Sequence, residues 1–194
     1  MKIRKIVLVL LVLLSIGLLF GQEEVKEVKP FGLYEGMPLK DIEIVEDLGD
    51  SFYEITPPDP STEFGQYYIL LNKDLGLCKV IAIKIEETNV YGTNVKSEYN
   101  KFKEMLTSNY GEPETDYDFL LTDSIWDEPK DWLMSLEKKE RILFSMWKVH
   151  QTSIGLEVNV YDYYSQECII KLSYEFSNFK KFCDDKEEDT KNKL

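Results

Sequence analysis

Residues 167–176 read "ECIIKLSYEF". Strict alternation of apolar and polar positions predicts a β-strand that is buried on one face only. Ile169 is the one apolar residue on the second face, which otherwise carries polar side chains. The first face is predicted to carry Cys168, Ile170, Leu172, Tyr174 and Phe176.

Other stretches of the chain predict strands that would pair with this one. The run at 75–87, "LGLCKVIAIKIEE", has aliphatic residues at alternate positions, and Leu77, Ile81, Ile83 and Ile85 are expected to share one face. Turn-forming residues between the runs, including a Pro-rich break after the first, are typical of antiparallel sheets. The remaining predicted strands are 51–55, 62–72, 141–149 and 154–164.

The clearest helix is predicted at 93–110, "TNVKSEYNKFKEMLTSNY". Gly111 and Pro113 follow it in the order typical of a helix end. Apolar residues recur at the spacing of one helical face. The inward side chains are predicted to be Val95, Tyr99, Phe102 and Leu106.

A second helix is predicted earlier, in "GMPLKDIEIVEDLG" at 36–49. Pro38 lies near its start and Gly49 ends it. Helical spacing is seen at Leu39, Ile42 and Val45. A third helix is expected to begin near Asp127 or Glu128 with Pro129 in its first turn, and its inward residues are Trp132, Leu133 and Leu136.

These elements repeat in order, because a helix precedes three strands twice. The sequence therefore predicts an α+β fold of two weakly repeated helix-on-antiparallel-sheet units, with a helical insertion in the second. The predicted boundaries are 1–21 for an exported leader, 22–30 for a polar lead-in, 31–92 and 93–183 for the two units, 115–140 for the insertion, and 184–194 for a disordered acidic tail.

The first residues, "MKIRKIVLVLLVLLSIGLLFG", combine basic residues with an apolar run at 6–20. A run of this length is typical of a signal peptide and short of the roughly 20 residues of a spanning helix. We therefore expect an exported protein, periplasmic or extracellular. The alternative is an uncleaved membrane anchor at 6–20, which would be the only contact with a membrane.

The charge of the chain is strongly negative, with 23 Lys and Arg against 36 Asp and Glu. The leader contains three of those cations and no acid, so the remainder has 20 against 36 and a net charge of −16. Such a surface repels phosphate backbones, which argues against nucleic acid as a partner. No phosphate-binding glycine loop, dinucleotide fingerprint or nucleophile elbow is present, so we expect neither a nucleotide nor a cofactor.

Cys78, Cys168 and Cys183 are an odd number of cysteines for an exported protein. One disulfide and one free thiol are compatible with the sequence, which does not choose the pair. Their spacing does not fit a metal site. His150 is the single histidine and lies in a predicted turn without a nucleophile motif nearby, so an ordinary exposed histidine is the favoured interpretation.

Two short stretches resemble known envelope modules. "GLYEGMPLKDIEIVEDLG" (32–49) and "VKSEYNKFKEMLTSNYGEPE" (95–114) are similar to the helix start and helix end of SmpA/OmlA-like and β-lactamase-inhibitory-protein-like modules. The resemblance implies a small exported helix-plus-sheet protein that binds other proteins and does no chemistry. This chain lacks the lipid-bearing cysteine of the SmpA-like proteins, and the insertion at 115–140 is foreign to both families.

The stretch 111–132, "GEPETDYDFLLTDSIWDEPKDW", concentrates carboxylates around two tryptophans. Paired carboxylates and stacking aromatics are the equipment of a glycosidase, and the same oxygens could bind calcium. The favoured interpretation is an acidic loop that leads into a helix, because nothing in it predicts the burial that would raise a carboxyl pKa. The candidates for catalysis are Glu112, Asp116, Asp127 and Glu128.

The tyrosines of "VYDYYSQE" (160–167) lie at the tip of a predicted strand pair. Exposed tyrosines and tryptophans suit protein contacts. We therefore predict a non-catalytic binding module of a bacterial-type envelope, whose partner is an envelope or secreted protein. A glycan-acting hydrolase and a purely structural surface protein are the alternatives. The predicted contact residues are Tyr161, Tyr163 and Trp126.

Overall fold

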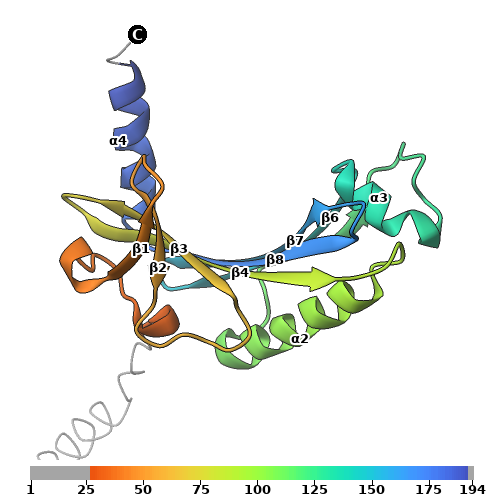
Figure 1. Ribbon diagram of the computed structural model, residues 1–194, viewed down its shortest axis with the longest axis horizontal. Coiled ribbons are helices and arrows are strands. Elements are labelled where there is room, and N and C mark those ends of the chain that lie inside the picture. The colour runs from red at the N-terminus through yellow and green to blue at the C-terminus, as the bar shows by residue number, and fades with distance from the viewer. Residues whose placement is uncertain (1–26, 192–194) are drawn as a thin grey trace, which may run out of the picture.

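The computed structural model describes residues 27–191, shown in Figure 1. The predicted leader at 1–21, most of the lead-in, and the last residues of the tail, 192–194, lie outside the described residues. No helix among residues 27–191 is long and apolar enough to cross a membrane.

One antiparallel sheet of eight strands organises the chain, and helices pack on it, which confirms the α+β class. Its spatial order is β1-β2-β3-β4-β8-β7-β6-β5. The strands in chain order are β1 (Glu43–Asp47), β2 (Phe52–Thr56), β3 (Gln66–Asn72), β4 (Gly76–Glu87), β5 (Thr115–Leu120), β6 (Arg141–Val149), β7 (Thr152–Asp162) and β8 (Glu167–Glu175).

The sheet consists of two four-stranded meanders that meet at its centre. Each meander runs from an edge strand inward, β1 to β4 and β5 to β8, and the last strands pair with each other from Lys79–Glu175 to Glu87–Glu167. Each half has four strands, whereas the predicted repeat had a helix followed by three. That the two halves are copies of one unit stays a prediction.

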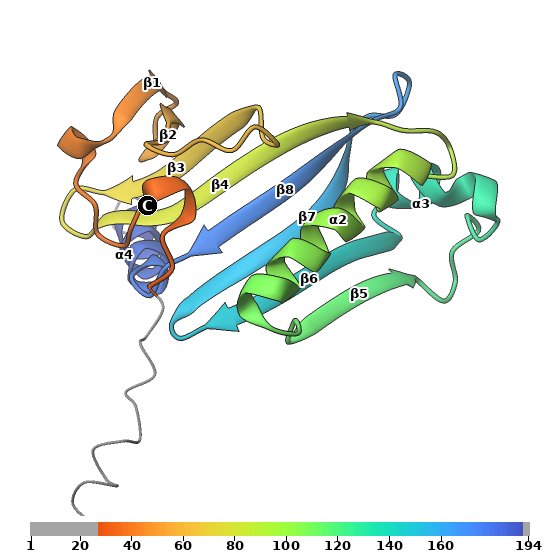
Figure 2. The ribbon, with the colours of Figure 1, turned by 90° about the horizontal axis from the view of Figure 1, so that it is seen from below.

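Helix α2 (Thr93–Tyr110) lies along one face of the sheet, as Figure 2 shows. The helix has the predicted bounds, and all four predicted inward residues are buried. Two polar contacts position it: Lys84 Nζ donates to Glu98 Oε2 at 2.9 Å, and Trp147 Nε1 donates to the carbonyl of Gly111 at 2.9 Å. We call this side of the sheet the covered face.

The short helices η3 (Pro129–Asp131) and α3 (Trp132–Glu137) follow β5 and contact β6 and β7. Their place matches the predicted third helix, and its three predicted inward residues are buried. Gly92 ends the loop before α2 with φ +67°, and a Cβ there would lie 2.1 Å from the ring of Trp132. The close approach of loop and tryptophan therefore depends on glycine at this position.

The N-terminal segment covers the same face over the first meander. It contains η1 (Pro30–Gly32) and η2 (Leu39–Asp41). Phe31 packs edge-on against Tyr67 at 4.9 Å between ring centroids, and Val28 is buried. Val28 and Pro30, which lie in the predicted polar lead-in, are thus buried, whereas Lys29 between them is exposed.

Three predictions of local structure are wrong. The helix expected at 36–49 is η2 followed by strand β1, whose side chains are largely exposed. The acidic stretch forms the other edge strand, β5, in place of a loop. The described part of the expected disordered tail, residues 184–191, is helical and belongs to α4 (Phe179–Lys191).

A bulge corrects the predicted face of β4. The pairing of β3 with β4 shifts between Leu70–Lys79 and Leu71–Leu77, which places an extra residue, Cys78, in β4. Leu77 therefore joins the covered face, whereas the isoleucines at 81, 83 and 85 point to the other one. The shift could not be read from the alternation, because both faces of this strand are apolar.

Candidate functional site

Three carboxylates of the acidic stretch, Asp116, Asp118 and Glu128, pair with three different cations. Asp116 accepts a hydrogen bond from Ser145 Oγ at 2.7 Å and pairs with Lys103. Asp118 pairs with Arg141 at 3.0 Å, where Nη1 donates to Oδ1.

The electrostatic environment of the candidate carboxylates also differs from that of a glycosidase. Burial alone would raise the pKa of Asp116, but hydrogen bonds from Lys103 and Ser145 together with the Lys103 charge lower it. A hydrogen bond from Lys130 lowers the pKa of Glu128. All four candidates are exposed, whereas a general acid needs a raised pKa. Lys103, Ser145 and Arg141 tie Asp116 and Asp118 to helix α2 and strand β6, which gives these two carboxylates a structural role.

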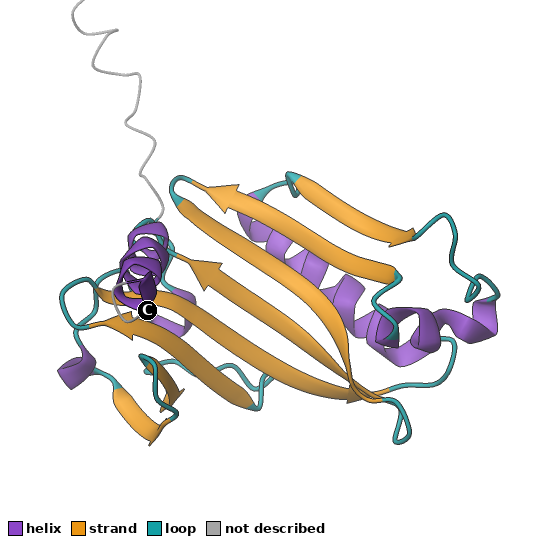
Figure 3. Ribbon diagram, turned by 90° about the horizontal axis from the view of Figure 1, so that it is seen from above, coloured by secondary structure: helices purple, strands orange, loops and turns teal. Residues whose placement is uncertain are grey.

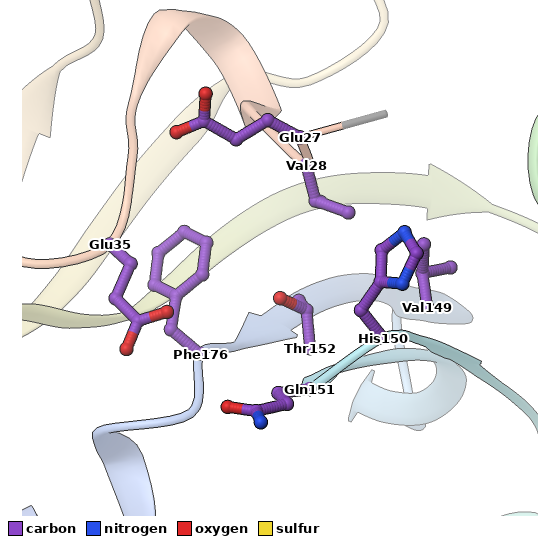
Figure 4. A pocket seen from close by; sticks show the side chains of 8 residues that line it. All are labelled: Glu27, Val28, Glu35, Val149, His150, Gln151, Thr152 and Phe176. Atoms are coloured by element: carbon purple, nitrogen blue, oxygen red, sulfur yellow. The ribbon is translucent and has the colours of Figure 1, made fainter. Parts of the chain in front are cut away.

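His150 borders a pocket of about 240 Å³ beside the β6–β7 turn, shown in Figure 4. Glu27 and Glu35 line the opposite side, and their carboxylates point away from the imidazole. The Glu35 carboxylate accepts hydrogen bonds from Ser177 and Asn178. Among the described residues that line it, Thr152 is the one with a hydroxyl and none has a thiol. The pocket is smaller than the roughly 300–1,000 Å³ typical of ligand sites, and its groups do not converge on one point.

The cysteines are free thiols among the described residues. Cys78 and Cys168 are buried and Cys183 is exposed on α4. Burial raises the pKa of Cys168 to about 12, which is the environment of an inert structural thiol. No group of three or more His, Cys, Asp or Glu within residues 27–191 is placed to hold a metal ion.

The three predicted contact residues lie in different surroundings. Tyr161 is 60 % exposed at a bulge near the end of β7. Tyr163 follows in the β7–β8 turn. Its side chain is half-buried and packs against the core, so it points outward less than predicted. Trp126 lies in the loop between β5 and η3 and is half-buried. Nothing in the structure brings Trp126 and the two tyrosines to one place.

The side of the sheet opposite α2 is left largely without a covering layer by the described residues, and we call it the open face. Figure 3 looks onto it, with α2 behind the strands. Among the helices of residues 27–191, α4 alone stands on this side, at the end of the sheet near the β1–β2 and β3–β4 turns (Figure 1). Phe179 of α4 lies under the ammonium of Lys79 at 5.0 Å.

The open face is rich in apolar side chains that are exposed or half-exposed. The edge strand β5 presents Tyr117 and Phe119 on this face, and their rings contact each other edge-on with 5.6 Å between centroids. Ile85 near the centre is 44 % exposed and Ile142 on β6 is 39 % exposed. By strand alternation and register the open face also carries Phe52, Tyr68, Leu70, Ile81, Ile83, Phe144, Met146 and Ile169.

The charged residues of this face are partly neutralised by one another. Lys79 pairs with Glu175 at 2.7 Å, and Lys171 pairs with Glu157. Both ion pairs join residues of neighbouring strands. The isoleucines between them stay uncovered. An apolar surface interrupted by internal ion pairs has the mixed composition of a protein-binding surface.

Sequence reasoning missed this face and chose loop tyrosines instead. One signal for it was present: β4 carries apolar residues on both faces, which is unnecessary for a strand with one solvated face.

No protein-family model, curated protein or solved structure matches the chain. The resemblance to the SmpA/OmlA-like and inhibitory-protein-like modules therefore stays a prediction, and the site rests on its own geometry.

Proposed function

We propose that this protein is a non-catalytic exported binding module that docks a partner protein on the open face. The observation that supports this most strongly is the asymmetry of the sheet. Helices α2 and α3 and the N-terminal segment cover one face, while the other exposes aliphatic and aromatic side chains from β2 to β8. A two-layer domain normally leaves polar residues on its uncovered face.

The remaining geometry is compatible with binding in place of chemistry. Asp116, Asp118 and Glu128 of the acidic stretch pair with nearby cations, and the groups that line the pocket at His150 do not converge on one point. Among residues 27–191, the strands place no histidine and no exposed thiol on the open face, so it offers area instead of reactive groups. Export follows from the predicted leader and is part of the same proposal.

The test is partner capture with variants that change the open face alone. The native envelope or secreted fraction is cross-linked to the purified protein, and recovered partners are identified. Ile85→Gln removes an exposed aliphatic side chain of the open face. Met105→Gln is the matched control, because Met105 is 49 % exposed on α2, on the opposite side of the molecule. Tyr161→Ala tests the predicted contact tyrosine.

We expect Ile85→Gln to weaken capture about tenfold, as for the loss of one apolar contact in an interface, and Met105→Gln to have no effect. Both variants are expected to unfold at the same urea concentration as the parent, since both positions are exposed. A partner that is lost equally with both variants, or with neither, would contradict docking on the open face. Recovery of no partner would favour the purely structural alternative.

A further inference from the structure

The carboxylates on the open side of the sheet are of two kinds. Glu157 and Glu175 form ion pairs with lysines of neighbouring strands. Glu46 on β1 and Glu54 on β2 also point to this side, but among residues 27–191 neither forms an ion pair. The open face thus has an excess of negative charge at the β1–β2 end.

These two glutamates lie directly opposite each other in the β1–β2 ladder. Like charges at opposed positions of a strand pair destabilise it. Glu54 lies in turn opposite Tyr68 on β3. The protein therefore holds two unpaired carboxylates next to an aromatic ring, an arrangement that costs stability in the free protein.

The ring of Tyr68 is itself part of an aromatic surface. Phe52 stacks on it with 5.3 Å between centroids and 19° between planes. Burial raises the pKa of Tyr68, and the charges of Glu54, Glu46 and Tyr161 raise it further. We call the four residues Glu46, Phe52, Glu54 and Tyr68 the Tyr68 corner.

A cation satisfies every group of the Tyr68 corner. A guanidinium or ammonium binds the faces of aromatic rings and forms charge-assisted hydrogen bonds with carboxylates. Arginine suits the site best, because its planar group stacks on rings while its N–H groups bind two acceptors. Ile81 lies opposite Tyr68 on the next strand, so apolar side chains beside such a cation would be buried at the same time.

Charge also selects against other occupants. A second copy of the chain would bring its own unpaired glutamates to the same surface, in a molecule whose net charge is already −13. Phosphate backbones and anionic lipid surfaces meet the same repulsion. A cationic segment of a partner protein is the one occupant whose charge is complementary to the surface.

We propose that the open face binds its partner through an arginine or lysine side chain that docks at the Tyr68 corner, with neighbouring apolar side chains of the partner on Ile81 and Ile83. This inference rests on the proposed function and names the chemistry of its partner. The partner segment is basic and apolar together, and its binding weakens as salt concentration rises.

The test uses a synthetic peptide that contains Arg and Leu residues, followed by NMR of the isotopically labelled protein. Two matched peptides replace every Arg by Glu or every Leu by Ser. The protein variant Glu46→Gln/Glu54→Gln removes the two unpaired charges. Glu104→Gln/Glu137→Gln is its control, because it removes two exposed charges on α2 and α3 and leaves the open face unchanged.

We expect the Arg–Leu peptide to shift the signals of Tyr68 and Ile81 and the other two peptides to bind more weakly. The Glu46→Gln/Glu54→Gln variant should lose about fivefold in affinity, as for two exposed ion pairs, and the control variant should bind like the parent. Equal binding of the Glu-containing peptide, or shifts confined to α2, would overturn the inference.

The outcome is separable from that of the proposed function. A native partner that is lost with Ile85→Gln but retained with Glu46→Gln/Glu54→Gln and in high salt would overturn the cationic contact and leave docking on the open face standing. Capture that is insensitive to Ile85→Gln would overturn both. Salt-sensitive self-association seen by sedimentation would replace the partner with a second copy and also overturn the inference.

Discussion

A hydrogen-bond relay between α2 and the edge of the sheet provides the sharpest test of the structural role of the acidic stretch. Tyr99 is 1 % exposed, and its hydroxyl lies 2.6 Å from Ser145 Oγ. Ser145 Oγ donates to Asp116 at 2.7 Å, so its single proton is used and Tyr99 must be the donor to Ser145. The relay therefore runs from a buried phenol to a carboxylate that also binds Lys103.

The relay predicts unequal effects of its two truncations. Tyr99→Phe removes one buried hydrogen bond and leaves Ser145 bonded to Asp116, which costs about 1 kcal/mol. Ser145→Ala leaves the Tyr99 hydroxyl buried without an acceptor, which costs about 2 kcal/mol. Asp116 is partly exposed and regains water. The double variant removes the donor and the acceptor together, so it should cost about 1 kcal/mol in place of the additive 3 kcal/mol.

Urea unfolding of the four proteins measures these free energies, with equal slopes as the check that the unfolded state is unchanged. A coupling of about 2 kcal/mol supports the relay and assigns Asp116 to packing of α2 on β6. Additive losses would refute the reasoning, because they would mean that the two hydroxyls do not interact. Loss of a glycan-hydrolysing activity in Asp116→Asn, with unfolding unchanged, would instead return the stretch to catalysis.

Three further predictions concern the backbone, acid stability and the thiols. Gly92→Ala should cost about 2–4 kcal/mol in urea unfolding, because its Cβ meets the ring of Trp132, whereas Gly65→Ala, with open space around it, should stay within about 0.5 kcal/mol. The lowered pKa of Asp116 gives stability that is present above its ordinary value of 3.8 and lost as pH falls below it, so unfolding of Asp116→Asn should depend less on pH between neutral and acidic buffer. A thiol reagent should label only Cys183 in the native protein and all three cysteines in denaturant; a second native label would contradict the described packing.

The central strands and α2 could be predicted because their burial is one-sided. In β8 apolar and polar positions alternate with Ile169 as the single exception, and the side chains predicted inward are buried. In α2 the four apolar positions fall on one helical stripe and contact the sheet. Local pattern and tertiary packing agree in these elements, so either one would have been sufficient.

The edge strands could not be predicted because neither has a buried face. Strand β5 has no buried residue, and in β1 only Ile44 is even half-buried. The spacing of Leu39, Ile42 and Val45 fits a helix by count, yet Val45 is 60 % exposed. Hydrogen bonding to β2 and β6 fixes these segments, and a pattern of side chains does not report it.

The open face shows a different limit of sequence reasoning. Alternation along β4 separates Val80 and Ala82 from Ile81 and Ile83, but both pairs are apolar. Which pair is buried depends on the side on which α2 crosses the sheet, a property of the connection after Glu87 and not of the strand. The sequence therefore indicated that β4 has two apolar faces without showing which one lacks a cover.

An uncovered apolar face carries a cost in solubility and in aggregation that a free protein must limit. The ion pairs Lys79–Glu175 and Lys171–Glu157 limit aggregation by placing charge between the isoleucines. Glu46 and Glu54 need another explanation. Glutamates paired with lysines would limit aggregation equally well, and they would avoid the repulsion between two opposed carboxylates. Solubility therefore explains the paired charges of this face, whereas recognition of a cation explains why two of its glutamates are left without a partner beside Tyr68.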